Sequence, residues 1–444
     1  MIAALLRRLG SPETARRLDS LAAGAPPSAP LSLDFELGSG GCDWLDALPA
    51  DDRFWYEARP ACGIFRLGMG QAFRVASAGP QRFAALDNAF AGLAAAWRRE
   101  GPARAFCGFA FDERERAPLP NALLEIPAVL LATEGGRARA VLTTSAGRRR
   151  EAPGEWQHLL ADPAPGAPAF RVRPVADTWL ADRAWTARAH AALRHIAAGR
   201  AGKIVLARGL RCIADRRPAP ARILAELAKA QADSTVFAHG SGASVFLGAS
   251  PEQLVRLDGR EACADALAGT AWPGSPALAG DKNRHEQAFV TTAILAALAP
   301  LCTSAPQAGP LAVRQAGSVA HLHAAISGAV RPGVTVFELL RALHPTPAVG
   351  GYPAAAALSW LAAHGERRNG WYSGGFGSLE AGGDGAFAVA LRSALIQGNV
   401  IDLQAGAGIV AGSEPAQELA ETDAKFATLL DALAAQAAED ARQA

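Results

Sequence analysis

Two carboxylates and a lysine recur at helical spacing near the end of the chain. Glu418, Glu421 and Lys425 occupy positions i, i+3 and i+7 of the segment 414–440, which is predicted to form one long helix, so they share one face. Two carboxylates at this spacing can bind a hard divalent cation, Mg²⁺ above all, and Glu286, at the start of another predicted helix, could supply a third. The alternative is a solvated stripe with a weak ion pair between Glu421 and Lys425, and the spacing taken alone favours that alternative.

Lysine is scarce in this chain. Of the 44 basic residues, four are lysines, namely Lys203, Lys229, Lys282 and Lys425. Arginine fills most surface and ion-pair roles equally well, but it cannot lose its proton in a protein, whereas a lysine can act as a base. Lys203 opens the apolar strand predicted at 203–210, and Glu252 follows another predicted strand. A lysine at a strand start is usually solvated, but Lys203 and Glu252 on opposite sides of one pocket would form a base and an acid.

An arginine stands among small residues in the segment AFAVALRSALI (386–396). If this segment is one strand, Arg392 shares a face with alanines, because side chains alternate along a strand. This pattern favours a cavity wall that binds a carboxylate through the guanidinium over an exposed strand face. The following segment 400–410 ends in AGAGIV, whose small residues would let a ligand approach the backbone N–H groups.

The elements that must position these residues alternate in the second half of the chain. Helices are predicted at 177–199, 219–233, 284–299, 335–343, 353–364 and 414–440. Strands are predicted at 203–210 and 319–327, and hairpins at 235–250 and at 386–396 with 400–410, which turns at Gln397–Asn399.

The first half of the chain has a different pattern. Residues 31–145 carry short apolar runs between turns and one helical stretch at 82–99, which predicts an antiparallel sheet with few helices. Residues 1–30 predict a short helix and a Pro/Ala/Ser linker, and the Arg-, Pro- and Gly-rich segment 145–170 predicts a long surface loop. The expected fold class is α/β, of the α+β kind, with large antiparallel sheets and helices packed over them.

Composition limits the class of protein. The chain has 444 residues, of which 50% are hydrophobic and 19% charged, so it can bury a large core. A formal net charge of +2 argues against a protein that coats nucleic acid or an anionic membrane. The six cysteines include no CxxC pair, and the apolar start MIAALL is too short for a signal peptide. We therefore expect a cytoplasmic protein with reduced thiols and no nucleic-acid or membrane partner.

A series of motifs resembles the chorismate-utilising enzymes. In order along roughly 177–434 they are KIVLARGL, FLGASPEQLV, LAGT, RHE, HLHAAISG, ALHPTPAVGG, RNGWYSGGFGSL, GAFAVALRSA and AGAGIVAGSEPAQELAETDAKFATLL. The segment LHPTPAVGG (343–351) together with Lys203 is similar to the isochorismate synthase branch of that family. Residues 31–170 resemble the family more weakly.

The resemblance implies a fold, a cofactor and a reaction. After the N-terminal helix and linker of 1–30, residues 31–444 would form a single unit, with a pseudo-symmetric pair of antiparallel sheets and the site between them. The reaction would be the reversible, Mg²⁺-dependent conversion of chorismate to isochorismate, by attack of water at C2 and loss of the C4 hydroxyl. The product would feed menaquinone, catecholate siderophore or salicylate synthesis, which share this chemistry.

The resemblance also implies a role for individual residues. Lys203 would activate the water, and Glu252 would protonate the departing hydroxyl. Glu286 and Glu421 would bind Mg²⁺ directly, and Glu418 would assist through water. The substrate-binding residues would be Gly269, Thr270, His321, Tyr372, Arg392, the backbone at Gly408, and Lys425.

Other members of the family remain as alternatives. Salicylate synthase shares the base and the acid and adds pyruvate elimination, but PTPAVGG disfavours it. Ala268 stands where aminodeoxychorismate synthases have a nucleophilic lysine, and anthranilate synthases lack the lysine at 203 and pair with a glutaminase. We therefore expect no glutaminase subunit, and a monomer. A non-catalytic chorismate-binding protein is the alternative outside enzymes.

Three positions depart from the family pattern. Relatives usually have an acidic residue at Asn283, a histidine at Gln287, and often a threonine or serine at Ala324. Asn283 removes a charge near the metal, so Mg²⁺ affinity is expected to be weaker.

Overall fold

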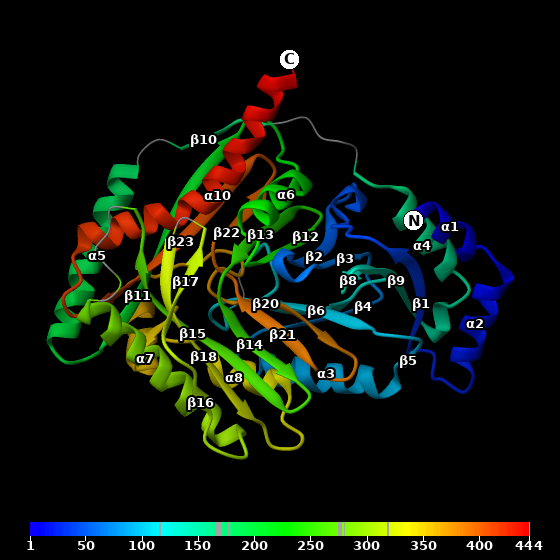
Figure 1. The fold of residues 1–444 in the computed structure, drawn as a ribbon, viewed down its shortest axis with the longest axis horizontal. Coiled ribbons are helices and arrows are strands. Elements are labelled where there is room, and N and C mark those ends of the chain that lie inside the picture. Colours follow the sequence, from blue (N-terminus) through cyan, green and yellow to red (C-terminus); the bar gives the residue numbers. More distant parts are fainter. Residues whose placement is uncertain are drawn as a thin grey trace.

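Two large sheets form the centre of the molecule. The computed structural model describes residues 1–114, 117–164, 170–175, 178–273, 278, 280–317 and 319–443. In these residues the sheets lie face to face with helices on the outside (Figure 1). Strand pairing is antiparallel except between β1 and β5. The predicted architecture of large antiparallel sheets with helices packed outside is confirmed.

The larger sheet has 13 strands within the described ranges. Their order is β10 (Val172–Pro174), β11 (Lys203–Ala214), β23 (Val400–Val410), β22 (Ser393–Gln397), β13 (Ser244–Ser250), β12 (Thr235–Ser241), β2 (Arg53–Arg59), β3 (Ile64–Met69), β8 (Val129–Glu134), β9 (Arg137–Ser145), β1 (Pro30–Ser39) and β5 (Arg98–Arg99), with β19 (Gly351–Tyr352) beside β11.

The smaller sheet has 10 strands in the same part of the chain. Their order is β16 (Gln307–Ala308), β18 (Val319–Ala329), β15 (Glu261–Ala271), β14 (Gln253–Asp258), β21 (Gly385–Val389), β20 (Gly375–Glu380), β6 (Arg104–Phe109), β7 (Ala122–Ile126) and β4 (Phe73–Ser77), with β17 (Ala312–Ala316) beside β18.

Helices cover the outer faces of both sheets (Figure 1). One end of the larger sheet carries α1 (Ile2–Leu9), α2 (Pro12–Ala22) and α4 (Ala152–Ala161), and the other end carries α5 (Thr178–Ala197), α6 (Pro220–Ala230) and α10 (Pro415–Gln443). The smaller sheet packs against α3 (Arg82–Ala96), α7 (Asp281–Leu298) and α8 (Val336–Leu343), and α9 (Ala354–Ala363) lies beside β11. No helix in the described ranges is long and apolar enough to cross a membrane.

Aromatic side chains fill the space between the sheets. Trp55 of the larger sheet stacks on Phe106 of the smaller one with a centroid distance of 5.6 Å, and Phe237 stacks on Phe376 at 5.0 Å. All four are almost completely buried. Large aromatic side chains bury much apolar area each, so this layer fixes the sheets against each other.

Two local predictions are wrong. The segment 145–170, predicted as a loop, contains α4, because Trp156 and Leu160 bury an apolar face there; residues 165–169 lie outside the described residues. The N-terminal segment forms two helices, since Ser11 caps α2 and Leu5 and Leu18 are both buried against the rest of the protein.

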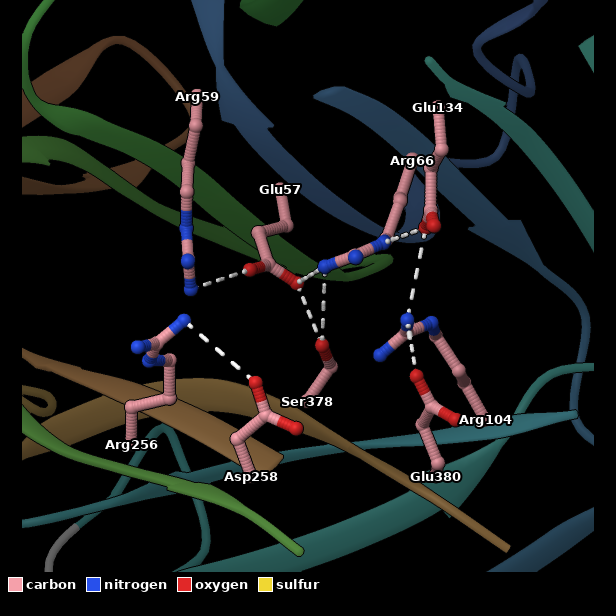
Figure 2. Close-up of polar contacts among 9 residues, drawn as sticks. All are labelled: Glu57, Arg59, Arg66, Arg104, Glu134, Arg256, Asp258, Ser378 and Glu380. Carbon is pink, nitrogen blue, oxygen red and sulfur yellow. Dashed lines mark hydrogen bonds and ion pairs between the residues drawn. The ribbon is translucent and has the colours of Figure 1, made fainter. Parts of the chain in front are cut away.

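A buried polar network also joins the two sheets (Figure 2). Glu57 of β2 is 0% exposed and accepts hydrogen bonds from Arg66 Nη1 at 2.9 Å and from Ser378 Oγ, on the smaller sheet, at 2.6 Å. The network continues through Glu134, which accepts from Arg66 Nε at 2.6 Å. Burial alone would raise the pKa of Glu57, but the charges of Arg66 and Arg59 and the bond from Ser378 lower it to about 2.

Replacing Glu57 by glutamine is expected to lower the free energy of unfolding by about 3–5 kcal/mol at neutral pH, because the buried Arg66 loses its buried carboxylate and keeps only Glu134, which is 41% exposed. The folded pKa of about 2 lies below the ordinary value of 4.5, so the carboxylate stabilises the protein fully above pH 4.5 and progressively less as pH falls towards 2. The difference from wild type should therefore shrink over that range in denaturant titrations. Asp258→Asn, which alters a carboxylate that is 70% exposed and pairs with Arg256, should cost less than about 1 kcal/mol. Equal effects of the two substitutions would contradict this assignment.

Candidate active site

The site lies where the chain crosses twice between the sheets. Glu252 lies where the chain passes from β13 of the larger sheet to β14 of the smaller one. Arg392 lies where it passes back from β21 of the smaller sheet to β22 of the larger one. The two crossings lie side by side, because Val389 N–H donates to the Glu252 carbonyl at 3.0 Å and Ala249 N–H donates to the Arg392 carbonyl at 3.2 Å. Both side chains therefore lie at the junction of the sheets.

The prediction of a single strand at 386–396 is wrong, because the chain passes from one sheet to the other within this segment. The segment breaks at Ala390–Arg392, and Arg392 has a left-handed φ of 46°. The argument from alternating faces therefore does not apply, although Arg392 does line a cavity. The predicted hairpin turn at Gln397–Asn399 is present between β22 and β23.

A cavity of about 690 Å³, its open mouth included, brings the predicted residues together. Its lining includes Lys203, Glu252, Gly269, Thr270, Glu286, His321, Tyr372, Arg392, Gly408, Glu421 and Lys425. Glu418 is buried next to it, one turn before Glu421 on α10, and is paired with Lys282. The residues come from both sheets and from α7 and α10, which both contact β23 (Figure 1).

Lys203 is buried at one wall of the cavity. Its side chain is 1% exposed, and its Nζ lies 2.8 Å from Glu286 Oε1. The pair packs directly over Gly408 on the neighbouring strand, where a Cβ would lie 2.4 Å from Glu286 Oε1 and 2.7 Å from Lys203 Cε. A glycine is therefore required at 408 for the ammonium and the carboxylate to meet.

Glu252 is the carboxyl group with the environment of an acid. Its Oε1 is buried without a hydrogen-bond partner among the described residues. Burial, followed by the charge of Asp265, raises its pKa to about 8, against the opposing charges of Lys203 and Lys425. The group is therefore protonated at neutral pH and can donate a proton.

Asp265 supports Glu252 and was missed in the sequence. Its carboxylate accepts from His323 Nε2 and from Arg314 Nη1, both at 2.8 Å, and from the Gln253 backbone N–H at 3.0 Å. Burial opposes ionisation, but these bonds and charges lower the pKa of Asp265, so it stays charged beside Glu252. The alternating pattern of β15 could have placed Asp265 on the cavity side of the sheet. The partners of Asp265 lie on β17 and β18, and the sequence of β15 does not predict them.

A bulge in β15 turns Thr270 into the site. Pairing with β18 shifts between Ala268 and Thr270, and Gly269 at the bulge has a left-handed φ of 66°. Thr270 Oγ1 then donates to Glu421 Oε1 at 3.0 Å. This contact ties the smaller sheet to α10 at the cavity.

His321 holds the guanidinium of Arg392. Arg392 Nη2 lies 2.9 Å from His321 Nε2 and can only donate, so Nε2 is an acceptor and the proton is on Nδ1, which lies 3.0 Å from the Gly269 carbonyl oxygen. Burial and the charge of Arg392 keep the pKa of His321 well below its usual range. His321 is thus a neutral residue that orients Arg392.

Lys425 and Tyr372 lie at β23. Lys425 Nζ donates to Glu421 Oε1 at 2.5 Å and to the Gly406 carbonyl at 2.7 Å. The Tyr372 hydroxyl lies over Gly406, where a Cβ would be 3.0 Å away. Burial raises the pKa of Tyr372 to about 12, so its hydroxyl remains a donor.

The three carboxylates predicted to bind metal are each matched by a lysine. The pairs are Glu286 with Lys203, Glu418 with Lys282, and Glu421 with Lys425. Within the described residues, no three His, Cys, Asp or Glu side chains are close enough together to hold a metal ion.

The donors nevertheless have the chemistry of a hard-cation site. All three are carboxylates and all are largely buried. Burial and the neighbouring charge of Glu421 raise the pKa of Glu418 to about 7, against the opposing charge of Lys282. Lys282 therefore does not offset the combined effect of burial and Glu421 at Glu418, and a divalent cation would stabilise the ionised carboxylate further.

The positions that depart from the family pattern lie around this site. Asn283 packs against Gly269, where a Cβ would lie 3.1 Å from Asn283 Cβ. Gln287 Nε2 donates to the Ala266 carbonyl at 2.8 Å, and Ala324 is buried on β18. These residues therefore contact or lie close to the β15 segment that leads to the bulge.

Comparison with known proteins identifies the family. A family model described as "Chorismate binding enzyme" matches residues 42–434. The chain belongs to this family. It is 35% identical over 412 residues to the salicylate biosynthesis isochorismate synthase of Pseudomonas aeruginosa, which covers 86% of this chain and 84% of the relative.

Solved structures agree with this. The menaquinone-specific isochorismate synthase from Escherichia coli has a TM-score of 0.78 and 26% identity, covering 97% of this chain and 98% of that one. A putative 2,3-dihydroxybenzoate-specific isochorismate synthase from Bacillus anthracis has a TM-score of 0.70 and 26% identity, covering 86% and 96%. The resemblance inferred from the sequence motifs is confirmed.

Proposed function

We propose that this protein is an isochorismate synthase that interconverts chorismate and isochorismate by adding water at C2 and releasing the C4 hydroxyl. One observation carries the proposal: a buried lysine and a carboxyl that is protonated at neutral pH face one cavity, at Lys203 and Glu252. A base and an acid are what this exchange of hydroxyl groups requires. The names of the relatives agree with it.

The charges of the cavity suit the substrate. Chorismate carries two carboxylates, and Arg392 and Lys425 both face the cavity. His321 and the Ala316 carbonyl, 2.9 Å from Arg392 Nη1, fix one edge of the guanidinium and leave its other N–H groups for a carboxylate. We assign Gly269, Thr270 and Tyr372 to the walls that orient the ring.

The chemical steps fall to two side chains. Lys203 first leaves its ion pair with Glu286 and gives one proton to solvent. The neutral amine then takes a proton from water as the new C2–O bond forms. The ring double bonds shift, the C4–O bond breaks, and Glu252 gives its proton to the leaving oxygen. One water is consumed and one released, and proton return from Lys203 to Glu252 restores the enzyme.

Mg²⁺ is part of the proposal. Glu286 and Glu421 would hold it directly and Glu418 through water, and the ion would supply positive charge to the ring carboxylate. Because the nucleophile is water, no glutaminase subunit is needed. The cytoplasmic location and the monomeric state stay predictions.

The product mixture tests the proposed function. Purified protein is incubated with chorismate, with Mg²⁺ or with a chelator, and the products are separated by chromatography. We expect an Mg²⁺-dependent equilibrium mixture of chorismate and isochorismate without pyruvate, reached from either compound. Salicylate with stoichiometric pyruvate would identify a salicylate synthase instead, and a folded protein that forms no product would indicate a non-catalytic chorismate-binding protein.

A further inference from the structure

Lys282 differs from the two other lysines around the carboxylates. Lys203 is enclosed in the cavity wall, and Lys425 has a second acceptor in the Gly406 carbonyl. Lys282 is the second residue of α7, one turn before Glu286. Its Nζ contacts Glu418 Oε1, and its side chain is 32% exposed. Of the three lysines, Lys282 can therefore leave its carboxylate partner and move into solvent at the smallest cost in free energy.

The ammonium of Lys282 interacts with all three carboxylates. Its Nζ contacts Glu418 directly, Glu286 lies one turn further along α7, and Glu421 lies one turn beyond Glu418 on α10. One side chain thus supplies positive charge to all three proposed metal ligands, as a bound cation would.

We propose that Lys282 is the built-in counter-cation of the metal site, which neutralises the carboxylates while no divalent cation is bound and moves to solvent when one binds. This inference rests on the proposed function. The charges support it. Without metal, three carboxylates face three lysines. With Arg392 included, the metal-free site has a net charge of +1, which a divalent cation and a doubly charged substrate leave unchanged. Release of Lys282 brings this sum to zero while Lys203 is still protonated.

Two consequences follow for the metal-free enzyme. Lys282 stabilises it, because it pairs the buried Glu418, and it competes with the metal for the same carboxylates. A lysine that only anchors α7 would not weaken metal binding. Removal of the charge should therefore tighten binding of the divalent cation and lower the stability of the metal-free protein.

Thermal-unfolding titrations with Mg²⁺ alone test the competition. They compare wild type with Lys282→Met, Lys282→Arg and the control Lys229→Met, which removes the charge of an exposed lysine on α6. Constant ionic strength and about pH 9 keep Glu418 ionised. We expect Lys282→Met to lower the Mg²⁺ concentration for half-saturation on the order of tenfold or more, and Lys282→Arg and Lys229→Met to leave it within about threefold. Unchanged or weaker Mg²⁺ binding by a folded Lys282→Met protein would overturn the inference.

Amine labelling of the wild-type protein gives a second readout that needs no variant. Lys282 should react faster with an acetylating reagent once the thermal shift shows Mg²⁺ to be saturating, and Lys229 should react at the same rate throughout, as mass spectrometry of the peptides would report. An unchanged Lys282 rate would contradict displacement. Mg²⁺-dependent isochorismate formation together with an unchanged Lys282 rate would overturn this inference and leave the proposed function intact.

Discussion

Lys203→Arg is expected to lower turnover of chorismate by about 10²–10⁴-fold, the usual contribution of a general base. Arginine retains the positive charge opposite Glu286, so the buried ion pair and the fold can persist, but arginine cannot lose its proton in a protein. The substitution therefore tests the role of Lys203 as a base separately from its role as the counter-ion of Glu286. Turnover is measured by chromatography of the products at saturating Mg²⁺, and folding by thermal unfolding of the same samples.

Two further variants make this result specific. Lys203→Met removes both the base and the charge, so it should lose activity to a similar extent and should also lose stability, because Glu286 stays buried without its partner. Lys229→Met changes an exposed lysine in the same way and should leave both quantities at the wild-type level. Turnover by Lys203→Arg above about a tenth of the wild-type rate would show that another group activates the water.

The sequence motifs were sufficient to locate the site but not to explain its geometry. Every residue carried over from the family resemblance lines the cavity except Glu418, which lies next to it. A motif match places a residue in the site even where the local sequence pattern does not predict the backbone structure around it. The roles of these residues stay predictions. The strand pattern around Arg392 was misread because Ala390 and Leu391 have the composition of a strand, although the chain leaves one sheet there and enters the other.

Long-range contacts account for what was missed. Asp265 is one acidic residue in an alternating strand, and only pairing with β17 and β18 brings Arg314 and His323 to it. Lys282 stood in a charged cluster that looks like ordinary polar surface at a helix start. Its partner Glu418 is on α10, more than a hundred residues later in the chain, and no local pattern predicts that contact.

Glu252→Gln is expected to reduce turnover by about 10²–10⁴-fold and to remove the alkaline limb of the pH profile. The wild-type carboxyl donates its proton only below its pKa of about 8, so wild-type turnover should decline above that pH. Glutamine keeps the shape of the side chain but has no acidic proton. Asp265→Asn should instead retain the limb and move it to lower pH, because it removes the charge that, after burial, raises the pKa of Glu252 most.

Glu252→Gln is expected to gain stability relative to wild type as pH rises, although it loses turnover. The folded pKa of about 8 lies above the ordinary value of 4.5, so the folded state binds the proton more tightly than the unfolded state does. Wild-type stability therefore falls as pH rises from 4.5 to about 8, by an amount on the order of several kcal/mol, and levels off above that range. Glutamine does not ionise, so the unfolding free energy of Glu252→Gln should gain steadily on wild type across the same interval in denaturant titrations. A difference that stays constant with pH would show that Glu252 titrates like an exposed carboxyl, and the acid would then have to be sought elsewhere in the cavity.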